Sequence, residues 1–278
     1  MRRPELDGPG PRRLCLVTGA SSGIGAALAR AYAARGFDLA LTARRSERLE
    51  ALAAELRAGH GATVLVLPGD QGVPDACDVI LGRIAEAGRT VDVLVNNAGY
   101  GLEGAHVRTP WPALETMLQV MLVAVTQTTQ RVLPGMVERR YGRILNVASL
   151  AGLMPGQSGA PLYNAIKAYL VRYSQSLHEE TLGRGVHVTA LCPGFTYSEF
   201  HDVSGSREVM KTLPSWMWMT AEAVAEAGYA AAEANRAVYV PGAANQALGA
   251  LFKVLPDSWI TAAVGRRRPR KARAEPAR

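Results

Sequence analysis

The chain has 278 residues, of which 48% are hydrophobic and 20% charged, so it can bury a sizeable core and does not have the composition of a disordered or collagen-like chain. No apolar run approaches the ~18 residues of a membrane-spanning helix, and the N-terminal residues lack the apolar stretch of a secretory signal. The three cysteines lie far apart and the five histidines show no ligand spacing, so we expect no disulfide, no metal site and a cytoplasmic protein.

The net charge of +7 is concentrated at the two ends of the chain. Residues 266–278 carry seven basic groups and one acidic group, and residues 1–13 carry four arginines and two acidic groups, which leaves the long middle nearly neutral. A specific nucleic-acid-binding protein would carry basic residues on its folded surface, so we expect no such partner. The basic tail suits peripheral contact with an acidic membrane surface, but a disordered, solubilising end is the favoured interpretation.

Short apolar runs rich in β-branched residues recur along the chain and predict seven buried strands. Their ranges are 14–19, 37–43, 62–68, 91–96, 143–149, 186–192 and 237–241. Stretches with helical periodicity lie between them, at 24–35, 46–58, 73–87, 113–139, 163–183 and 220–234. Strands that alternate with helices over the whole body indicate an α/β protein with one doubly wound parallel sheet in a single domain.

The segments outside this alternation set the predicted boundaries. Residues 1–12 are expected to form a flexible basic N-terminus and residues 265–278 a disordered basic tail. The main domain spans 13–242, with an insertion at 195–219 that breaks the alternation, and residues 243–264 are expected to form a helical extension that packs on it.

The first predicted strand leads directly into a glycine-rich turn, T-G-x-x-x-G-x-G at residues 18–25, and then into a helix. Gly19 allows the tight turn, Gly23 removes the Cβ where a pyrophosphate approaches the backbone, and Gly25 lets the helix pack close to the strand. The helix N-terminus offers free N–H groups and a positive dipole to phosphates. This position between a strand and a helix favours a dinucleotide-binding turn over a plain glycine turn.

A second group of chemistry-bearing residues follows the fifth predicted strand. Tyr163 and Lys167 are four residues apart and share one face of a helix, while Ser149 stands at the carboxyl end of the strand, where ligands bind in open α/β sheets. We expect the lysine to lower the tyrosine pKa from ~10 toward neutrality, so that Tyr163 exchanges a proton with a carbonyl or an alcohol. The Ser149 hydroxyl is expected to hold the substrate oxygen and stabilise its charge.

Together these motifs resemble the short-chain dehydrogenase/reductase family. The chain also has the family's N-N-A-G, at residues 96–99 after the fourth strand, and its Pro193-Gly194 pair after the sixth. The resemblance covers roughly residues 12–242. It implies a Rossmann-like catalytic domain with strand order 3-2-1-4-5-6-7, hydride transfer between a nicotinamide cofactor and a carbonyl or secondary alcohol, and a homodimer or homotetramer.

The resemblance also assigns site residues. It implies that Ser149, Tyr163 and Lys167 are the catalytic residues and that the cofactor lies along the carboxyl edge of the sheet. The cofactor contacts expected from it are Gly19, Ser21, Ser22, Gly23, Ile24, Gly25, Arg44, Arg45, Asp70, Asn97, Ala98, Gly99, Tyr163, Lys167, Pro193, Gly194 and Thr196.

The residues after the second strand indicate which cofactor is bound. Family members that bind NAD usually carry an acid there, whereas this chain has Arg44 and Arg45, whose guanidinium groups suit the 2′-phosphate of NADP(H). Arg44 is the first candidate and Arg45 the second; the alternative is a solvated arginine pair that opens the next helix. Asp70 matches an adenine-contacting acid of the family but is equally suited to a turn.

The substrate side is predicted from the insertion at 195–219, which resembles the family's lid. Its Trp216 and Trp218, with Tyr100 and Leu102 after the N-N-A-G motif, suit a bulky apolar ketone or a 3-oxoacyl or steroid-like compound. The alternative is that these large side chains only cover the core or a subunit contact.

One position departs from the family pattern. Met121 stands where the family usually has an asparagine that helps to hold a water in the proton relay, and a thioether is a weak acceptor and no donor. The sequence therefore predicts an NADPH-dependent carbonyl reductase, with a slow or inactive NADP(H)-binding sensor or scaffold as the alternative.

Overall fold

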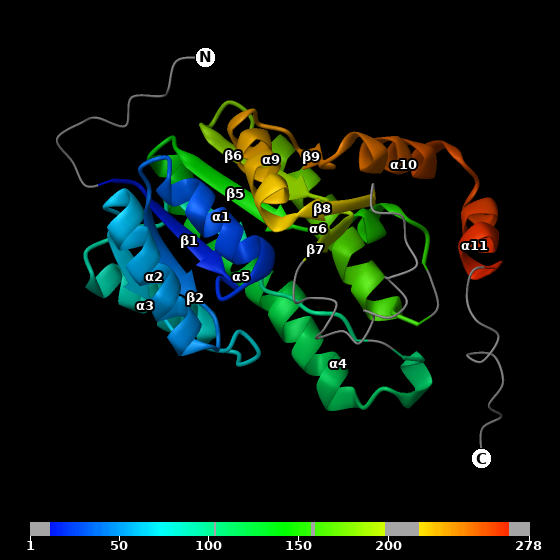
Figure 1. Cartoon of the computed structure of the whole chain (residues 1–278), viewed down its shortest axis with the longest axis horizontal. Helices are drawn as coiled ribbons and strands as arrows, with labels where there is room; N and C mark the ends of the chain where they lie inside the picture. Colours follow the sequence, from blue (N-terminus) through cyan, green and yellow to red (C-terminus); the bar gives the residue numbers. More distant parts are fainter. Residues whose placement is uncertain (1–11, 103, 157–158, 198–216, 267–278) are drawn as a thin grey trace.

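The computed structural model describes residues 12–102, 104–156, 159–197 and 217–266. Its core is a sheet of seven parallel strands in the order β3-β2-β1-β4-β5-β6-β9 (Figure 1), which confirms the predicted order and the doubly wound fold. The strands are β1 (Leu14–Thr18), β2 (Asp38–Thr42), β3 (Val64–Val66), β4 (Val93–Asn96), β5 (Gly142–Val147), β6 (Val186–Leu191) and β9 (Val238–Tyr239). Every strand boundary lies within two residues of its prediction.

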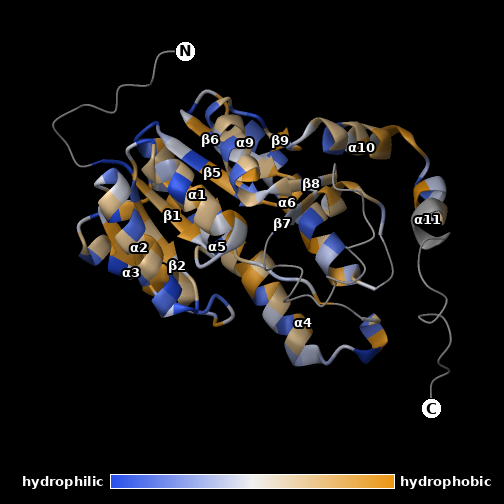
Figure 2. Ribbon diagram, viewed as in Figure 1, coloured by the Kyte–Doolittle hydropathy of each residue, from blue (hydrophilic) through white to orange (hydrophobic). Residues whose placement is uncertain are grey.

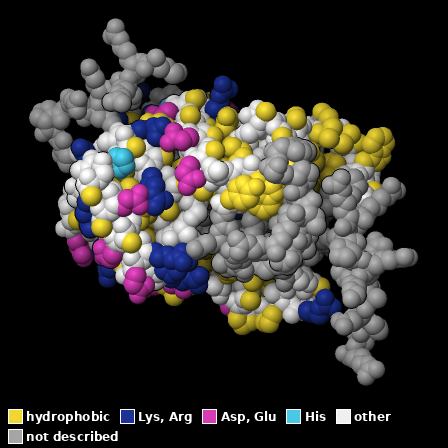
Figure 3. Space-filling view, viewed as in Figure 1, with side chains coloured by type: hydrophobic (Ala, Val, Ile, Leu, Met, Phe, Trp, Pro, Cys, Tyr) yellow, Lys and Arg dark blue, Asp and Glu magenta, His cyan; other side chains and the backbone are white. Residues whose placement is uncertain are grey.

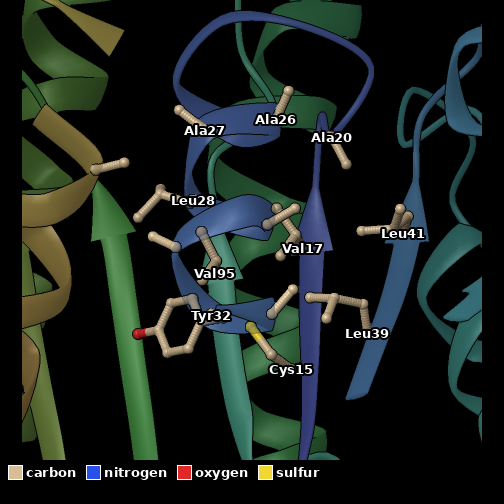
Figure 4. Close-up of a cluster of buried hydrophobic side chains, with 14 of the residues drawn as sticks. Cys15, Val17, Ala20, Ala26, Ala27, Leu28, Tyr32, Leu39, Leu41 and Val95 are labelled. Carbon is tan, nitrogen blue, oxygen red and sulfur yellow. The ribbon is translucent and has the colours of Figure 1, made fainter. Parts of the chain in front are cut away.

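Helices cover both faces of the sheet. They are α1 (Gly23–Ala33), α2 (Ser46–His60), α3 (Ala76–Glu86), α4 (Trp111–Leu118), α5 (Ala124–Glu138), α6 (Pro161–Glu180), α9 (Ala221–Glu233), α10 (Ala243–Val254) and α11 (Asp257–Arg266). Alternation along β1 explains the two layers: Cys15 and Val17 face a cluster with α1, α2 and α9, whereas Leu14 and Leu16 face α3, α5 and α6. Figure 4 shows the first cluster around Tyr32, and Figure 2 shows how strongly hydrophobic β1 and β2 are.

The stretch predicted as one long helix, 113–139, is two helices. α4 ends at Leu118 and α5 begins at Ala124, with one π-helical turn, Gln119–Val123, between them. A π turn widens the backbone without breaking the apolar periodicity, so the hydrophobic pattern did not predict it. The turn holds Met121, whose side chain is only 1% exposed.

The insertion at 195–219 contains a small sheet that was not predicted. β7 (Phe195–Tyr197) pairs in parallel with β8 (Trp218–Thr220), and the Trp218 ring stacks on Tyr197 with 4.8 Å between their centroids. The residues between these strands, 198–216, lie outside the described part of the chain, and so does the predicted substrate residue Trp216.

The C-terminal extension forms α10 and α11. α10 packs against the 3₁₀ turn Leu150–Leu153, which follows β5, and its outer face is apolar (Figure 3), with Leu251 43% and Val254 76% exposed. In the ranges that the structure describes, no helix combines the length and hydropathy needed to cross a membrane. The predicted basic ends of the chain fall almost entirely on residues 1–11 and 267–278, which are not described.

Candidate active site

The glycine-rich turn is close-packed and opens α1. Gly19 and Gly23 have φ angles of +66° and +55°, a region that favours glycine. A Cβ on Gly25 would lie 2.4 Å from the Asn97 amide nitrogen and from the Gly19 carbonyl oxygen, so neither neighbour leaves room for a side chain. Ser22 precedes α1 but its side chain does not cap the helix, which leaves the first-turn N–H groups for an anion.

The N-N-A-G segment holds this turn in place. The Asn97 side-chain amide donates hydrogen bonds to the carbonyls of Thr18 (2.9 Å) and Gly19 (3.2 Å). The backbone N–H groups of Asn97 and Ala98 donate to the Thr18 hydroxyl at 2.9 and 3.0 Å. Asn97 and Ala98 are predicted cofactor contacts. Thr18 is not among the predicted residues; it is buried at the end of β1, and its hydroxyl connects β1 to β4.

Arg45 contacts the glycine-rich turn. Its guanidinium donates to the Ser22 hydroxyl at 2.8 Å and to the Ser21 hydroxyl at 3.0 Å. Arg44 is exposed beside it, and its positive charge opposes the rise that burial causes in the pKa of Tyr100. Two cations therefore stand next to two hydroxyls and a helix N-terminus, which together can hold a phosphate group.

Asp70 and Ile24 lie at the edges of this region. The Asp70 carboxylate accepts a hydrogen bond from the Gly72 backbone at 2.8 Å, as the turn interpretation predicts. Its negative charge also contributes to the raised pKa of Tyr100. Ile24 is partly buried against the α1 side of the core.

Ser149, Tyr163 and Lys167 meet at the carboxyl end of β5. The Ser149 hydroxyl hydrogen-bonds Tyr163 and also accepts from the Ala151 backbone N–H at 3.1 Å. Lys167 lies one helical turn beyond Tyr163, is 5% exposed, and donates from Nζ to the Val147 carbonyl at 2.7 Å. Its Nζ is 5.6 Å from the centre of the Tyr163 ring. The fold thus assembles all three predicted side chains.

The protonation behaviour of this trio differs from the expectation. Burial raises the pKa of Tyr163 to about 12, and the hydrogen bond from Ser149 only partly opposes it. Burial also lowers the pKa of Lys167 to about 8. The expectation that Lys167 brings the tyrosine pKa toward neutrality is wrong for this arrangement, because the ammonium is directed at the Val147 carbonyl and desolvation dominates. Tyr163 therefore holds its proton at neutral pH and is suited to donate it.

Met121 belongs to the apolar surroundings of Tyr163. It belongs to a buried cluster with Met117, Val120 and Ile166, and Tyr163 packs against the same cluster. A Cβ on Gly99 would lie 3.2 Å from the Met121 methyl group, so the thioether also supports the N-N-A-G backbone.

The predicted substrate residues are partly accounted for. Tyr100 and Leu102 pack on the buried cluster that contains Met121, as Tyr163 does. Trp218 lies on β8 and contacts Phe195 as well as Tyr197, so its ring covers β7. In the ranges that the structure describes, no three acidic, histidine or cysteine side chains gather as a metal site.

The Pro193-Gly194 turn lies beside Ser149. The Pro193 carbonyl accepts from the Leu150 backbone N–H at 2.8 Å, and the Thr196 hydroxyl donates to the Gly194 carbonyl at 3.2 Å. Asn245 of α10, which packs against Gly194, is not among the predicted site residues. No sequence signal marks Asn245, because α10 also carries Gln246 and Lys253 and the burial of one polar residue among them is visible only in the folded chain.

Comparison with known proteins decides the family. A model of the short chain dehydrogenases matches residues 13–208. The chain belongs to the short-chain dehydrogenase family. Nodulation protein G of Rhizobium sp. (strain N33) is 38% identical over 246 residues, which cover 87% of this chain and 98% of that protein. The NADP-dependent 3-hydroxy acid dehydrogenase YdfG of Salmonella typhi is 36% identical, with 77% of this chain and 86% of that protein covered.

A solved structure agrees with this assignment. The short-chain dehydrogenase from Sphingobium yanoikuyae in complex with NADPH shares 31% identity and a TM-score of 0.75, over 88% of this chain and 97% of that one. The family resemblance inferred from the motifs is thereby confirmed, and this short-chain dehydrogenase is an oxidoreductase that acts on hydroxyl or carbonyl groups.

Proposed function

We propose that the protein transfers hydride between NADP(H) and the carbonyl or secondary alcohol carbon of a small apolar substrate. The observation that carries this proposal is the meeting of Ser149, Tyr163 and Lys167 at the same sheet edge as the glycine-rich turn. A dinucleotide held by the turn reaches along that edge toward the three side chains, since ligands bind at the carboxyl ends of parallel strands.

The residues of the turn fit NADP(H) better than NAD(H). Positive-φ glycines and the uncapped start of α1 suit the pyrophosphate, and Arg45, anchored on Ser21 and Ser22, suits the 2′-phosphate. The NADP dependence of YdfG and the NADPH complex of the Sphingobium enzyme support the same cofactor. When bound, the nicotinamide supplies or accepts the hydride.

Each residue of the trio has a distinct role in carbonyl reduction. Tyr163, protonated at neutral pH, donates its proton to the carbonyl oxygen as negative charge develops there. The Ser149 hydroxyl holds the same oxygen by a hydrogen bond. The Lys167 ammonium, still mostly charged at pH 7 with a pKa of about 8, is held by the Val147 carbonyl and binds the ribose hydroxyls of the cofactor.

The walls near Tyr163 favour an apolar substrate. Tyr100 and Leu102 pack on the same cluster as Tyr163, and we propose that Trp216 and Trp218 also contact the substrate. Large aromatic and aliphatic side chains around a few polar groups suit a bulky ketone, a 3-oxoacyl group or a steroid-like compound.

Turnover by a Tyr163→Phe variant tests the proposal. NADPH oxidation, followed by nicotinamide absorbance, is measured against cyclic ketones, 3-oxoacyl thioesters, steroids and quinones. Loss of the proton donor is expected to lower kcat by roughly 10²–10⁴-fold. Tyr173→Phe, on the same helix but outside the trio, is the matched control and is expected to retain activity. A Tyr163→Phe variant as fast as wild type would refute the assigned role.

A second candidate function rests on Met121. Its buried thioether lies where family members usually carry an asparagine, so a slow or inactive NADP(H)-binding sensor is the alternative. Met121→Asn distinguishes the two. If wild type binds NADPH without reducing any compound and the variant gains turnover, the sensor function is favoured; turnover by wild type favours the reductase.

We also propose a cytoplasmic homodimer or homotetramer. Trp111 and Trp259 are 61% and 67% exposed on the single chain, and such side chains are often covered by a partner subunit. Light scattering after size-exclusion chromatography gives the mass directly, and a monomer would contradict this assembly. Addition of anionic vesicles at low salt tests the alternative, peripheral membrane contact by the basic tail.

A further inference from the structure

Helix α10 carries one polar side chain into the protein interior. Asn245 is 3% exposed, and its side-chain nitrogen donates to the Pro241 carbonyl at 3.1 Å and to the Met219 sulfur at 3.8 Å. Pro241 follows the last strand of the main sheet, and Met219 lies in the middle of β8. One side chain therefore joins the sheet, the C-terminal extension and the root of the insertion.

The same amide lies directly on Gly194. A Cβ at Gly194 would be 2.5 Å from the Asn245 oxygen and 2.7 Å from its Cγ and nitrogen. Asn245 therefore occupies the space that a side chain at position 194 would fill. Gly194 follows Pro193, whose carbonyl accepts a hydrogen bond from the backbone N–H of Leu150, the residue after Ser149.

α10 also packs against the 3₁₀ turn that follows the predicted catalytic residue Ser149. Gly249 of α10 packs against the 3₁₀ turn: a Cβ added to it would lie 3.5 Å from a methyl carbon of Leu150 and 3.6 Å from one of Leu153. On the other side of that turn, a Cβ on Gly152 would be 2.5 Å from the Lys167 carbonyl oxygen. The turn after Ser149 is thus packed between α10 and the backbone of α6 at Lys167.

Packing alone does not explain an asparagine at this position. Its side-chain oxygen is buried and has no hydrogen-bond partner among the described residues. Burial of an unsatisfied acceptor is costly, and an apolar side chain of similar size would avoid that cost. What an asparagine provides here, and an apolar side chain would not, is the pair of hydrogen bonds from its side-chain nitrogen to Pro241 and Met219, next to its contact with Gly194.

We infer that Asn245 is a positioning residue that sets the nicotinamide end of the cofactor site by holding Gly194 and β8. The adenine end is formed elsewhere, by Arg45 and the glycine-rich turn. This inference rests on the proposed function, because it assumes that NADP(H) extends from Arg45 toward Ser149.

The two ends can be tested separately. Dissociation constants of NADPH and of 2′,5′-ADP, which lacks the nicotinamide half, are measured by calorimetry for wild type, Asn245→Ala and Asn245→Asp. Loss of about one net hydrogen bond is expected to weaken NADPH binding by about five- to tenfold. Binding of 2′,5′-ADP is expected to stay unchanged. Gln246→Ala, on the exposed side of the same helix, is the matched control and leaves both constants unchanged.

The other outcomes are equally decisive. Equal weakening of both ligands with a lower Tm would show a merely structural role, and unchanged NADPH binding would also overturn the inference. If both Asn245 variants fail to fold, Met219→Leu keeps the asparagine and removes one of its acceptors; it should weaken NADPH selectively, and no selective effect counts against the inference. Wild type that binds neither ligand would overturn the proposed function instead.

Discussion

The burial of Lys167 makes stability depend on pH in a predictable direction. Its side chain is 5% exposed, and burial lowers its pKa from an ordinary 10.5 to about 8. Below pH 8 both folded and unfolded chains carry the proton. Between pH 8 and 10.5 the unfolded chain holds more protons than the folded chain, so the free energy of unfolding rises with pH. The difference in pKa corresponds to about 3 kcal/mol.

Lys167→Met isolates this contribution because it keeps the length of the side chain and removes the charge. Urea unfolding of wild type and variant is compared between pH 7 and pH 10. The variant is expected to be the more stable at pH 7, and its advantage is expected to shrink by about 2–3 kcal/mol as pH rises, since wild type no longer buries a charge. Arg172→Met, an exposed cation on the same helix, controls for removal of a positive charge. A difference that does not change with pH would refute the reasoning.

Two further predictions concern cofactor choice and packing. Arg45→Ala removes a charge-assisted contact to the 2′-phosphate. It is expected to weaken NADPH binding by roughly 10–100-fold in a titration and to leave NADH binding unchanged. Arg184 is exposed just before β6, so Arg184→Ala is the control and is expected to change the binding of neither cofactor. Gly152→Ala places a Cβ 2.5 Å from backbone atoms of α6 and is expected to cost about 1–3 kcal/mol in thermal unfolding. Gly59→Ala, in α2 with open space around it, is expected to stabilise by about 0.5–1 kcal/mol, and equal effects would contradict this argument.

The sequence predicted those parts of the site that local spacing determines. Tyr163 and Lys167 share a helix face because they are four residues apart, and Ser149 meets them because parallel strands end at one edge of the sheet. The contact between Asn245 and Gly194 joins residues 51 positions apart in the chain. No periodicity specifies which turn of α10 lies over which loop, so that contact became visible only in the folded chain.

Sequence proximity also gave the wrong electrostatic expectation for the trio. A lysine four residues from a tyrosine lowers the tyrosine pKa only if its ammonium approaches the hydroxyl, and here Lys167 is turned toward the Val147 carbonyl. Helical spacing fixes the shared face but not the rotamer at the end of a long side chain, nor the amount of water that the surrounding helices exclude.

The pKa of Tyr163 determines which proton transfer this side chain can perform at neutral pH. Reduction of a carbonyl needs a tyrosine that still carries its proton, whereas oxidation of an alcohol needs the phenolate. Burial on the apolar cluster around Met121 raises the pKa of Tyr163 to about 12, so nearly every molecule holds the acid form at neutral pH. The apolar cluster around Met121 therefore suits a Tyr163 that acts as a proton donor.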